Sequence, residues 1–289
     1  MSNEAGQSGS VLYIPHGGGP LPLLGHPGHQ DLVDFLFEIT PKLGQPSAIV
    51  VISAHWEAPV VTITSGKSPQ LIYDYYGFPE EAYKIKYPAP GAPELAKQIF
   101  HLLKQDGIEA KLDEQRGFDH GLFVPLKLMY PNADIPCVQI SLHSSFDAES
   151  HINIGRALSA LRHENLLVIG SGFSFHNMDA LKSQSAESMM GRNIAFEKWL
   201  IETCTGVNLS PGQRESRLIN WLEAPHARYC HPREEHLLPL HVCFGMANSA
   251  AANSAAANSA AANSAGANSA ADLVFEGNVV GVKVSGYRW

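Results

Sequence analysis

The sequence lacks paired cysteines, a long apolar run and a cluster of basic residues. Its four cysteines lie far apart without a Cys-x-x-Cys pair, so we expect free thiols in a reducing compartment, the cytoplasm. No apolar stretch approaches the ~20 residues of a membrane helix, and the first ten residues do not resemble a secretory signal peptide. A net charge of −8 without a Lys/Arg run argues against a nucleic-acid partner.

Short, nearly continuous apolar runs are the clearest structural signal, because strands buried on both faces of a parallel sheet read in this way. The predicted strands are Val11–Ile14, Ala48–Ile52, Pro136–Ile140 and Leu166–Ile169. Helical patterns lie between or after them, at Gln30–Glu38, Pro93–Gln105, His151–Arg162 and Met189–Thr203. This alternation predicts an α/β fold with a mostly parallel central sheet covered by helices, of the phosphorylase/hydrolase-like kind. The last apolar segments, 272–276 and 279–284, predict an antiparallel hairpin at one edge.

We expect a single catalytic domain over residues 11–289, preceded by a flexible stretch at residues 1–10. Residues 247–271 are five copies of Ala-Asn-Ser-Ala-Ala, with Gly266 closing the fourth copy. A five-residue period matches neither a helix nor a strand and builds no continuous buried face. We therefore predict a mobile surface loop inserted within the domain, with a frayed helix as the alternative.

Histidine is abundant, with 14 among 289 residues, and three histidines occupy equivalent places. His16, His55 and His176 each follow a predicted strand. Because ligands bind outside the carboxyl ends of the strands in open parallel sheets, we expect these three side chains to converge. Any one of them alone is more simply explained as a surface or hydrogen-bonded histidine. Together they indicate a metal site, since neutral imidazole is the commonest metal-binding side chain.

Two further histidines have glycine or acidic residues as sequence neighbours. His120 lies in Gly-Phe-Asp-His-Gly, which indicates either a loop at a site or an ordinary Asp/Gly turn. His236 follows Glu234 and Glu235 at the start of a predicted apolar helix. The helix dipole explains two acidic residues in a first turn, but it does not explain the histidine.

Eight ordered segments between about Val11 and Gly245 resemble a known family. They are PHGGGP, VVISAHWE, YGFPEEAY, YPAPGAPELA, RGFDHGLFVPL, MYPNADIPCVQIS, GSGFSFHN and REEHLLPLHV. The family is that of the DOPA-dioxygenase-type class III extradiol ring-cleavage dioxygenases, in the protocatechuate 4,5-dioxygenase beta-subunit superfamily. The resemblance covers nearly all of the chain except the repeat.

The resemblance implies roles for the five histidines. His16, His55 and His236 are expected to bind the metal, His176 to act as the acid/base residue beside it, and His120 to bind substrate or oxygen. Many extradiol enzymes instead hold Fe(II) with two histidines and a carboxylate. Fe(II) is therefore the metal expected for activity, whereas three imidazoles also suit Zn(II) in the purified protein.

The implied reaction is opening of the aromatic ring of a catechol-type substrate by O₂ to a semialdehyde. The partners are a small-molecule catechol and O₂, with no membrane involved. Trp56, Phe173 and Phe175 are candidate pocket walls, although each is more simply explained by packing. Glu235 is the alternative third ligand. Two other functions stay open at this point: a zinc-dependent hydrolase using the same histidines, and a scaffold protein that has lost catalysis.

Overall fold

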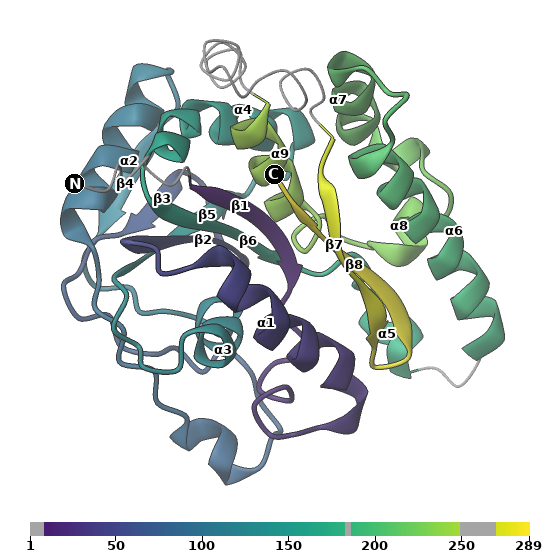
Figure 1. Ribbon diagram of the computed structural model, residues 1–289, viewed down its shortest axis with the longest axis horizontal. Coiled ribbons are helices and arrows are strands. Elements are labelled where there is room, and N and C mark those ends of the chain that lie inside the picture. Colours follow the sequence, from purple (N-terminus) through teal and green to yellow (C-terminus); the bar gives the residue numbers. More distant parts are fainter. Residues whose placement is uncertain (1–8, 183–185, 249–269) are drawn as a thin grey trace, which may run out of the picture.

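The computed structural model describes residues 9–182, 186–248 and 270–289, whose strands form one eight-stranded sheet in the order β4-β3-β5-β2-β6-β1-β8-β7 (Figure 1). The strands are β1 (Ser10–Pro15), β2 (Ala48–Ala58), β3 (Val61–Thr64), β4 (Ala110–Asp113), β5 (Cys137–His143), β6 (Leu166–Gly172), β7 (Asp272–Val279) and β8 (Val282–Arg288). The four central strands β5, β2, β6 and β1 are parallel neighbours. The hairpin of β7 and β8 joins β1 in antiparallel orientation. The predicted parallel sheet with an antiparallel edge is therefore confirmed.

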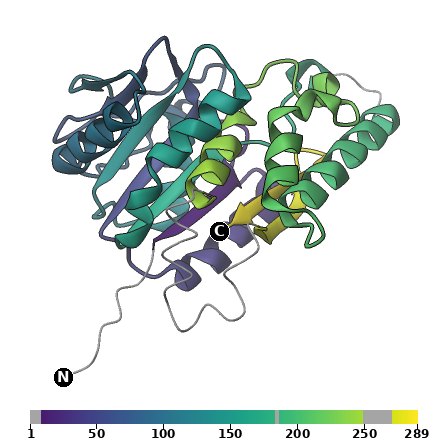
Figure 2. The same ribbon diagram turned by 90° about the horizontal axis from the view of Figure 1, so that it is seen from above.

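Helices cover both faces of this sheet. They are α1 (Gln30–Leu43), α2 (Pro93–Gln105), α3 (His120–Met129), α4 (Ala148–Ala157), α5 (Met178–Lys182), α6 (Ala186–Thr205), α7 (Pro211–Ile219), α8 (Ala227–Cys230) and α9 (Leu238–Ala247). Short 3-10 helices span Pro27–His29, Glu80–Lys84, Ser159–His163 and Trp221–Glu223. Figure 2 shows α6 and its neighbouring helices beside the β7–β8 hairpin, at the opposite side of the molecule from α2.

Strand β6 shows how the two faces are covered. On one face, the Cβ of any larger residue at Gly170 would lie 2.6 Å from the carbonyl oxygen of Pro239 in α9, so only glycine permits this helix to pack so closely. Ser171 points to the opposite face, where its hydroxyl donates to the carbonyl oxygen of Gly121 in α3 at 2.5 Å. Side chains alternate along a strand, so α3 and α9 lie on opposite faces of the sheet. Gly170 therefore serves helix packing, whereas Gly172 makes room for the carbonyl oxygen of His236 just before α9.

Strand β2 runs further than its apolar sequence predicts. Its pairing with β5 shifts register between Ser53 and Glu57, so that residues 54–56 bulge out of the ladder. A bulge re-aims a side chain that regular alternation would place elsewhere. His55 lies in this bulge, within the strand and not after it. The apolar run of β2 predicted the strand but not its irregular end.

Other differences concern elements with weak local signals. Strands β3 and β4 were not predicted, because each has only four residues and β4 is largely exposed. The helix predicted from His151 begins at Ala148, where Asp147 caps it, and ends before a 3-10 helix. The acidic first turn predicted at residues 234–236 is wrong, since α9 begins at Leu238 with Pro239 in its first turn and no acidic residue there.

Two predictions lie wholly or partly outside the described residues. Residues 1–8 and 249–269 are not described, so the expected flexible start and the mobile repeat loop are untested there. At the end of the repeat, the backbone N–H of Ala271 donates to the carbonyl oxygen of Cys204 at 2.8 Å. Among the described residues no helix has the length and apolar character needed to cross a membrane.

Candidate active site

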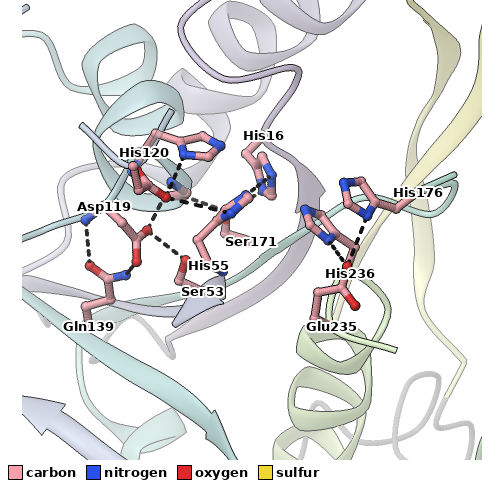
Figure 3. Close-up of polar contacts among 12 residues, drawn as sticks. His16, Ser53, His55, Asp119, His120, Gln139, Ser171, His176, Glu235 and His236 are labelled. Atoms are coloured by element: carbon pink, nitrogen blue, oxygen red, sulfur yellow. Dashed lines mark hydrogen bonds and ion pairs between the residues drawn. The ribbon is translucent and has the colours of Figure 1, made fainter. Parts of the chain in front are cut away.

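Five histidines meet at the carboxyl ends of the central parallel strands (Figure 3). His16 follows β1, His55 lies in the bulge of β2, His120 opens α3, His176 follows β6, and His236 precedes α9. These segments are adjacent because β1, β6 and β2 are consecutive neighbours in the sheet. The convergence predicted for His16, His55 and His176 is therefore present, and two histidines from outside the strands join it.

Three of these histidines form a compact group of nitrogen ligands. One nitrogen from each of His16, His55 and His236 lies within 4.8 Å of the other two. The Nε2 atoms of His16 and His55 are 2.9 Å apart. Metal–nitrogen bonds of about 2.1 Å place two nitrogens of one ion roughly 3.0 to 3.4 Å apart, so this separation is slightly shorter than that of a metal-bound pair.

Ser171 fixes the orientation of His16. The Nδ1 atom of His16 lies 3.0 Å from the Ser171 hydroxyl, which has its single hydrogen committed to the carbonyl oxygen of Gly121. Ser171 can therefore only accept at Nδ1, which must carry the hydrogen. Nε2 of His16 is then unprotonated, and its lone pair faces Nε2 of His55. This is the form in which imidazole binds a metal.

Glu235 orients His236 in the same way on the other side of the site. Its Oε1 atom lies 3.0 Å from Nδ1 of His236 and 3.0 Å from Nδ1 of His176. The two rings stack, with centroids 3.4 Å apart and an interplanar angle of 17°. One carboxylate oxygen thus contacts Nδ1 of both His236 and His176, and it leaves the Nε2 atom of each ring free of this contact.

Asp74 is the third residue at the site whose oxygen faces a histidine Nδ1, after Ser171 and Glu235. Its Oδ1 accepts from the backbone N–H of His120 at 3.0 Å, and its Oδ2 lies 2.9 Å from Nδ1 of the same residue. Oδ2 is also 3.7 Å from Nδ1 of His55, which is beyond hydrogen-bonding range but close enough for charge attraction. The rings of His55 and His120 are 3.8 Å apart between centroids.

A buried carboxylate, Asp119, anchors the backbone under the site. It accepts from Ser53 at 2.8 Å and from the N–H of Gly121 at 3.1 Å, and it contacts Gln139 and the Arg116 guanidinium. Ser53 in turn accepts from the backbone N–H of His55 at 3.1 Å. Burial raises the pKa of Asp119, which these contacts counteract. The motif Gly117–Gly121 is therefore a shaped structural turn that also delivers a site histidine.

Burial keeps His16, His55 and His236 neutral. It lowers the pKa of His16, His55 and His236 well below the ordinary value, and repulsion by the neighbouring histidines lowers it further. Burial by itself raises the pKa of Asp74, but the hydrogen bond and charge of His120 outweigh it, so the pKa is lowered. For Glu235, the hydrogen bond from His176 likewise outweighs burial and lowers the pKa. Neutral imidazoles beside two carboxylates suit a divalent cation.

The aromatic candidates lie in packed surroundings. Phe175 is fully buried, with its ring centroid 6.4 Å from that of Tyr229. Trp56 is 6% exposed, and the Arg116 guanidinium lies 4.3 Å from its ring centroid. Sequence reasoning missed Tyr75, whose ring centroid is 5.8 Å from that of His120. It also missed the orienting side chains. Ser171 could have been noticed as a polar residue in an apolar strand, whereas Asp74 carries no such signal.

Comparison with known proteins places the chain in a family. The family model described as the catalytic LigB subunit of aromatic ring-opening dioxygenase matches residues 11–271. The chain is 42% identical to the dioxygenase TasH of Hapsidospora irregularis, over 82% of this chain and 78% of that protein. It is 41% identical to the 4,5-DOPA dioxygenase extradiol of Portulaca grandiflora, over 70% of this chain and 73% of that protein.

A solved structure agrees with this. The crystal structure of an uncharacterized Escherichia coli K12 protein superposes with a TM-score of 0.74 at 28% identity, over 98% of this chain and 99% of the other. The chain belongs to the LigB family of aromatic ring-opening dioxygenases. This confirms the resemblance and the expected function, extradiol cleavage of a catechol-type ring by O₂. The hydrolase alternative receives no support.

Proposed function

We propose that this member of the LigB family is an Fe(II)-dependent extradiol dioxygenase whose metal is held by the Nε2 atoms of His16, His55 and His236. The observation that carries the proposal is the convergence of these three imidazoles within 4.8 Å of one another. Ser171 and Glu235 support it, because each receives the Nδ1 hydrogen of one ligand and so directs its Nε2 lone pair inward.

The donor set decides which metals fit. When bound, Fe(II) supplies a Lewis-acidic centre with open positions, at which both catechol oxygens and O₂ can be held. Three neutral imidazoles are also a common Zn(II) donor set. We propose that Fe(II) supports activity and that Zn(II) can fill the same site in purified protein. Glu235 is not proposed as a ligand, because its Oε1 is engaged by His236 and His176 and its Oε2 lies 3.9 Å from the Arg233 guanidinium.

We propose that His176 moves the protons of the reaction. Its Nδ1 hydrogen is held by Glu235 at 3.0 Å, which leaves Nε2 free to accept a catechol proton and later return it. The arrangement of carboxylate, imidazole and acceptor nitrogen is that of a general base whose orientation is fixed by a neighbour. Its stacking on His236 keeps this nitrogen next to the metal ligands.

We propose that His120 contacts the substrate or O₂ from the other side of the site. Its ring lies 5.3 Å from His16 and 3.8 Å from His55, measured between centroids, so it borders two of the proposed ligands. Trp56 and Phe175 are left out of the proposed substrate contacts, because Arg116 covers the first and the second is fully buried. The proposed substrate class is a catechol, and DOPA is the first catechol to test, since the names of several relatives specify it.

Oxygen consumption tests the proposal directly. Metal-free protein is reconstituted anaerobically with Fe(II), and O₂ uptake and a yellow ring-opened product are followed with DOPA and a panel of other catechols. Uptake is expected with Fe(II) and not with Zn(II). Absence of uptake across the panel by the Fe(II)-loaded protein would refute the proposed function.

Two variants separate the proposed roles, and a third is their control. His55→Ala should lose the metal, because it removes one of three ligands, whereas His176→Ala should keep the metal and lose most turnover, on the order of 100-fold or more. His143→Ala should change neither, since this histidine ends β5 and its Nδ1 contacts Ser145. Metal loss in the His176 variant but not in the His55 variant would show that the roles are wrongly assigned.

We also propose the cytoplasm as the site of action. The four cysteines, Cys137, Cys204, Cys230 and Cys243, are buried and unpaired, which suits a reducing compartment. Burial raises the pKa of each thiol, to about 12 for Cys137, so none is activated as a thiolate.

A further inference from the structure

Asp74 lies in the long connection between β3 and α2, in a segment that is fastened to the chain just before His120. The N–H of Ile72 donates to the carbonyl oxygen of Phe118, and the N–H of Phe118 donates to that of Gln70, both at 2.8 Å. These paired backbone bonds fix the register between the two segments. Asp74 is thereby delivered to the beginning of α3 by backbone pairing.

The two carboxylate oxygens of Asp74 have separate tasks on one histidine. Oδ1 accepts from the backbone N–H of His120 at 3.0 Å, which ties the start of α3 to the segment. Oδ2 lies 2.9 Å from the ring atom Nδ1 of the same residue. The ring of Tyr75 packs against His120, and the Tyr75 hydroxyl donates to the carbonyl oxygen of Ala82 at 2.7 Å. The ring of His120 is thus held at its Nδ1 edge by Asp74 and contacted by an aromatic neighbour.

We propose that Asp74 is a positioning residue for the ring-opening reaction: it holds the hydrogen of His120 on Nδ1 and so presents an unprotonated Nε2 to the substrate or O₂. The proposal rests on the proposed function, in which His120 contacts the reactants. A carboxylate has no hydrogen to give, and its negative charge 2.9 Å from Nδ1 favours the tautomer with the hydrogen on that nitrogen. Nε2 then acts only as an acceptor, suited to a catechol hydroxyl or a protonated oxygen species.

The opposite side of the site supports the positioning role of Asp74, because a carboxylate also lies beside the Nδ1 atoms of two histidines there. Glu235 contacts Nδ1 of the proposed ligand His236 and Nδ1 of the adjacent His176. Asp74 contacts Nδ1 of His120 and, at 3.7 Å, Nδ1 of the proposed ligand His55. Each carboxylate therefore lies near one proposed ligand and one neighbouring histidine, although Glu235 hydrogen-bonds its proposed ligand whereas Asp74 only attracts His55 by charge. Two histidines with oriented Nε2 atoms then flank the proposed metal ligands.

Asp74→Asn is a sharp test because it changes one of the two tasks and keeps the other. The amide oxygen can still accept from the backbone N–H of His120, while the amide NH₂ now faces Nδ1. An NH₂ group can only donate, so Nδ1 must lose its hydrogen and Nε2 must gain one. The fold and the metal ligands keep their contacts, but the nitrogen that faces the reactants changes from acceptor to donor.

Nitrogen NMR reads the tautomer without any turnover. In ¹⁵N-histidine-labelled, Zn(II)-loaded protein, the ring signals of His120 are identified by their loss in His120→Gln. Wild type should show the hydrogen on Nδ1, and Asp74→Asn should show it on Nε2. A hydrogen on Nε2 of His120 in wild type would overturn the proposal, and this wild-type measurement does not depend on whether Asp74→Asn folds.

Turnover of the Fe(II)-loaded protein gives the functional readout. Asp74→Asn should retain its metal and lose kcat by about 100-fold or more, as expected when a catalytic histidine is held in the wrong tautomer. Asp34→Asn, an exposed change of the same kind in α1, should leave kcat unchanged. A switched tautomer with kcat within about two-fold of wild type would refute the positioning role, since acid–base effects at this level are far larger. If wild type opens no catechol, the proposed function fails, and the NMR result alone then decides what Asp74 does.

Discussion

The orientation of His16 by Ser171 allows one prediction to be worked out in detail. Ser171 is fully buried on β6. Its hydroxyl donates a hydrogen bond to the carbonyl oxygen of Gly121 at 2.5 Å and accepts one from Nδ1 of His16 at 3.0 Å. Ser171→Ala removes both contacts while changing the side-chain volume little. His16 then loses the acceptor that holds its hydrogen on Nδ1, and its Nε2 is no longer fixed as a ligand.

Two magnitudes follow from this geometry. Loss of a group that orients a metal-binding histidine typically weakens metal affinity about 10- to 100-fold, or about 1.4 to 2.7 kcal/mol. The same substitution leaves the carbonyl oxygen of Gly121 without its donor, which costs about 1 to 3 kcal/mol of folding stability. Zn(II) affinity is measured by competition with a chromophoric chelator, and the free energy of unfolding by urea denaturation of the metal-free protein.

Ser285→Ala is the matched control. Ser285 is equally buried, and its hydroxyl bonds Glu197 at 2.6 Å and Tyr287 at 2.8 Å, but it contacts no site histidine. It should lose comparable stability with Zn(II) affinity unchanged. The reasoning is refuted if Ser171→Ala binds Zn(II) within about two-fold of wild type, well short of the expected loss. It is equally refuted if Ser285→Ala weakens binding as much.

Two further predictions concern stability. Burial lowers the pKa of His29 and His151 to about 4 and that of His231 to about 3. As the pH falls, these histidines are protonated in the unfolded chain before they are protonated in the folded protein. The free energy of unfolding therefore decreases from about pH 6.5 toward pH 4, by about 2 kcal/mol per histidine at pH 5. A free energy of unfolding that does not decline between pH 7 and pH 5 would contradict this. Asp119→Ala should cost about 3 to 5 kcal/mol, because it leaves Arg116 and several buried donors unpaired; a urea midpoint close to that of wild type would show that the network contributes little.

Local sequence was sufficient for the framework of the fold. The run Ala48–Ile52 is continuously apolar, as required of a strand covered by helices on both faces, and the structure places it between two parallel neighbours. The hairpin from Asp272 was equally legible, since two apolar segments separated by a turn pair antiparallel. Strands β3 and β4 could not be read, because four-residue strands carry too little pattern to distinguish them from loops.

The active site, like the fold, has features that the sequence predicted and features that it did not. The positions of His16 and His176 just beyond strands predicted that they would meet, because parallel strands end at one edge of the sheet. The contacts that orient them were not predictable. Ser171 is 155 residues from His16, and Asp74 is 46 residues from His120, so nothing in the local pattern of either partner indicates the other. Even the bulge that turns His55 toward the site is defined only by its pairing with β5.

The sequence by itself therefore determined which histidines gather and on what kind of sheet, since apolar periodicity and strand ends are local properties of the chain. The tertiary structure decided which ring nitrogen of His16, His120, His176 and His236 faces a neighbouring oxygen. That choice depends on an oxygen atom about 3 Å from Nδ1, which comes from a serine on a neighbouring strand or from a carboxylate on a distant loop. This oxygen determines which ring nitrogen carries the hydrogen, and the other nitrogen can then act as a metal ligand or as a base.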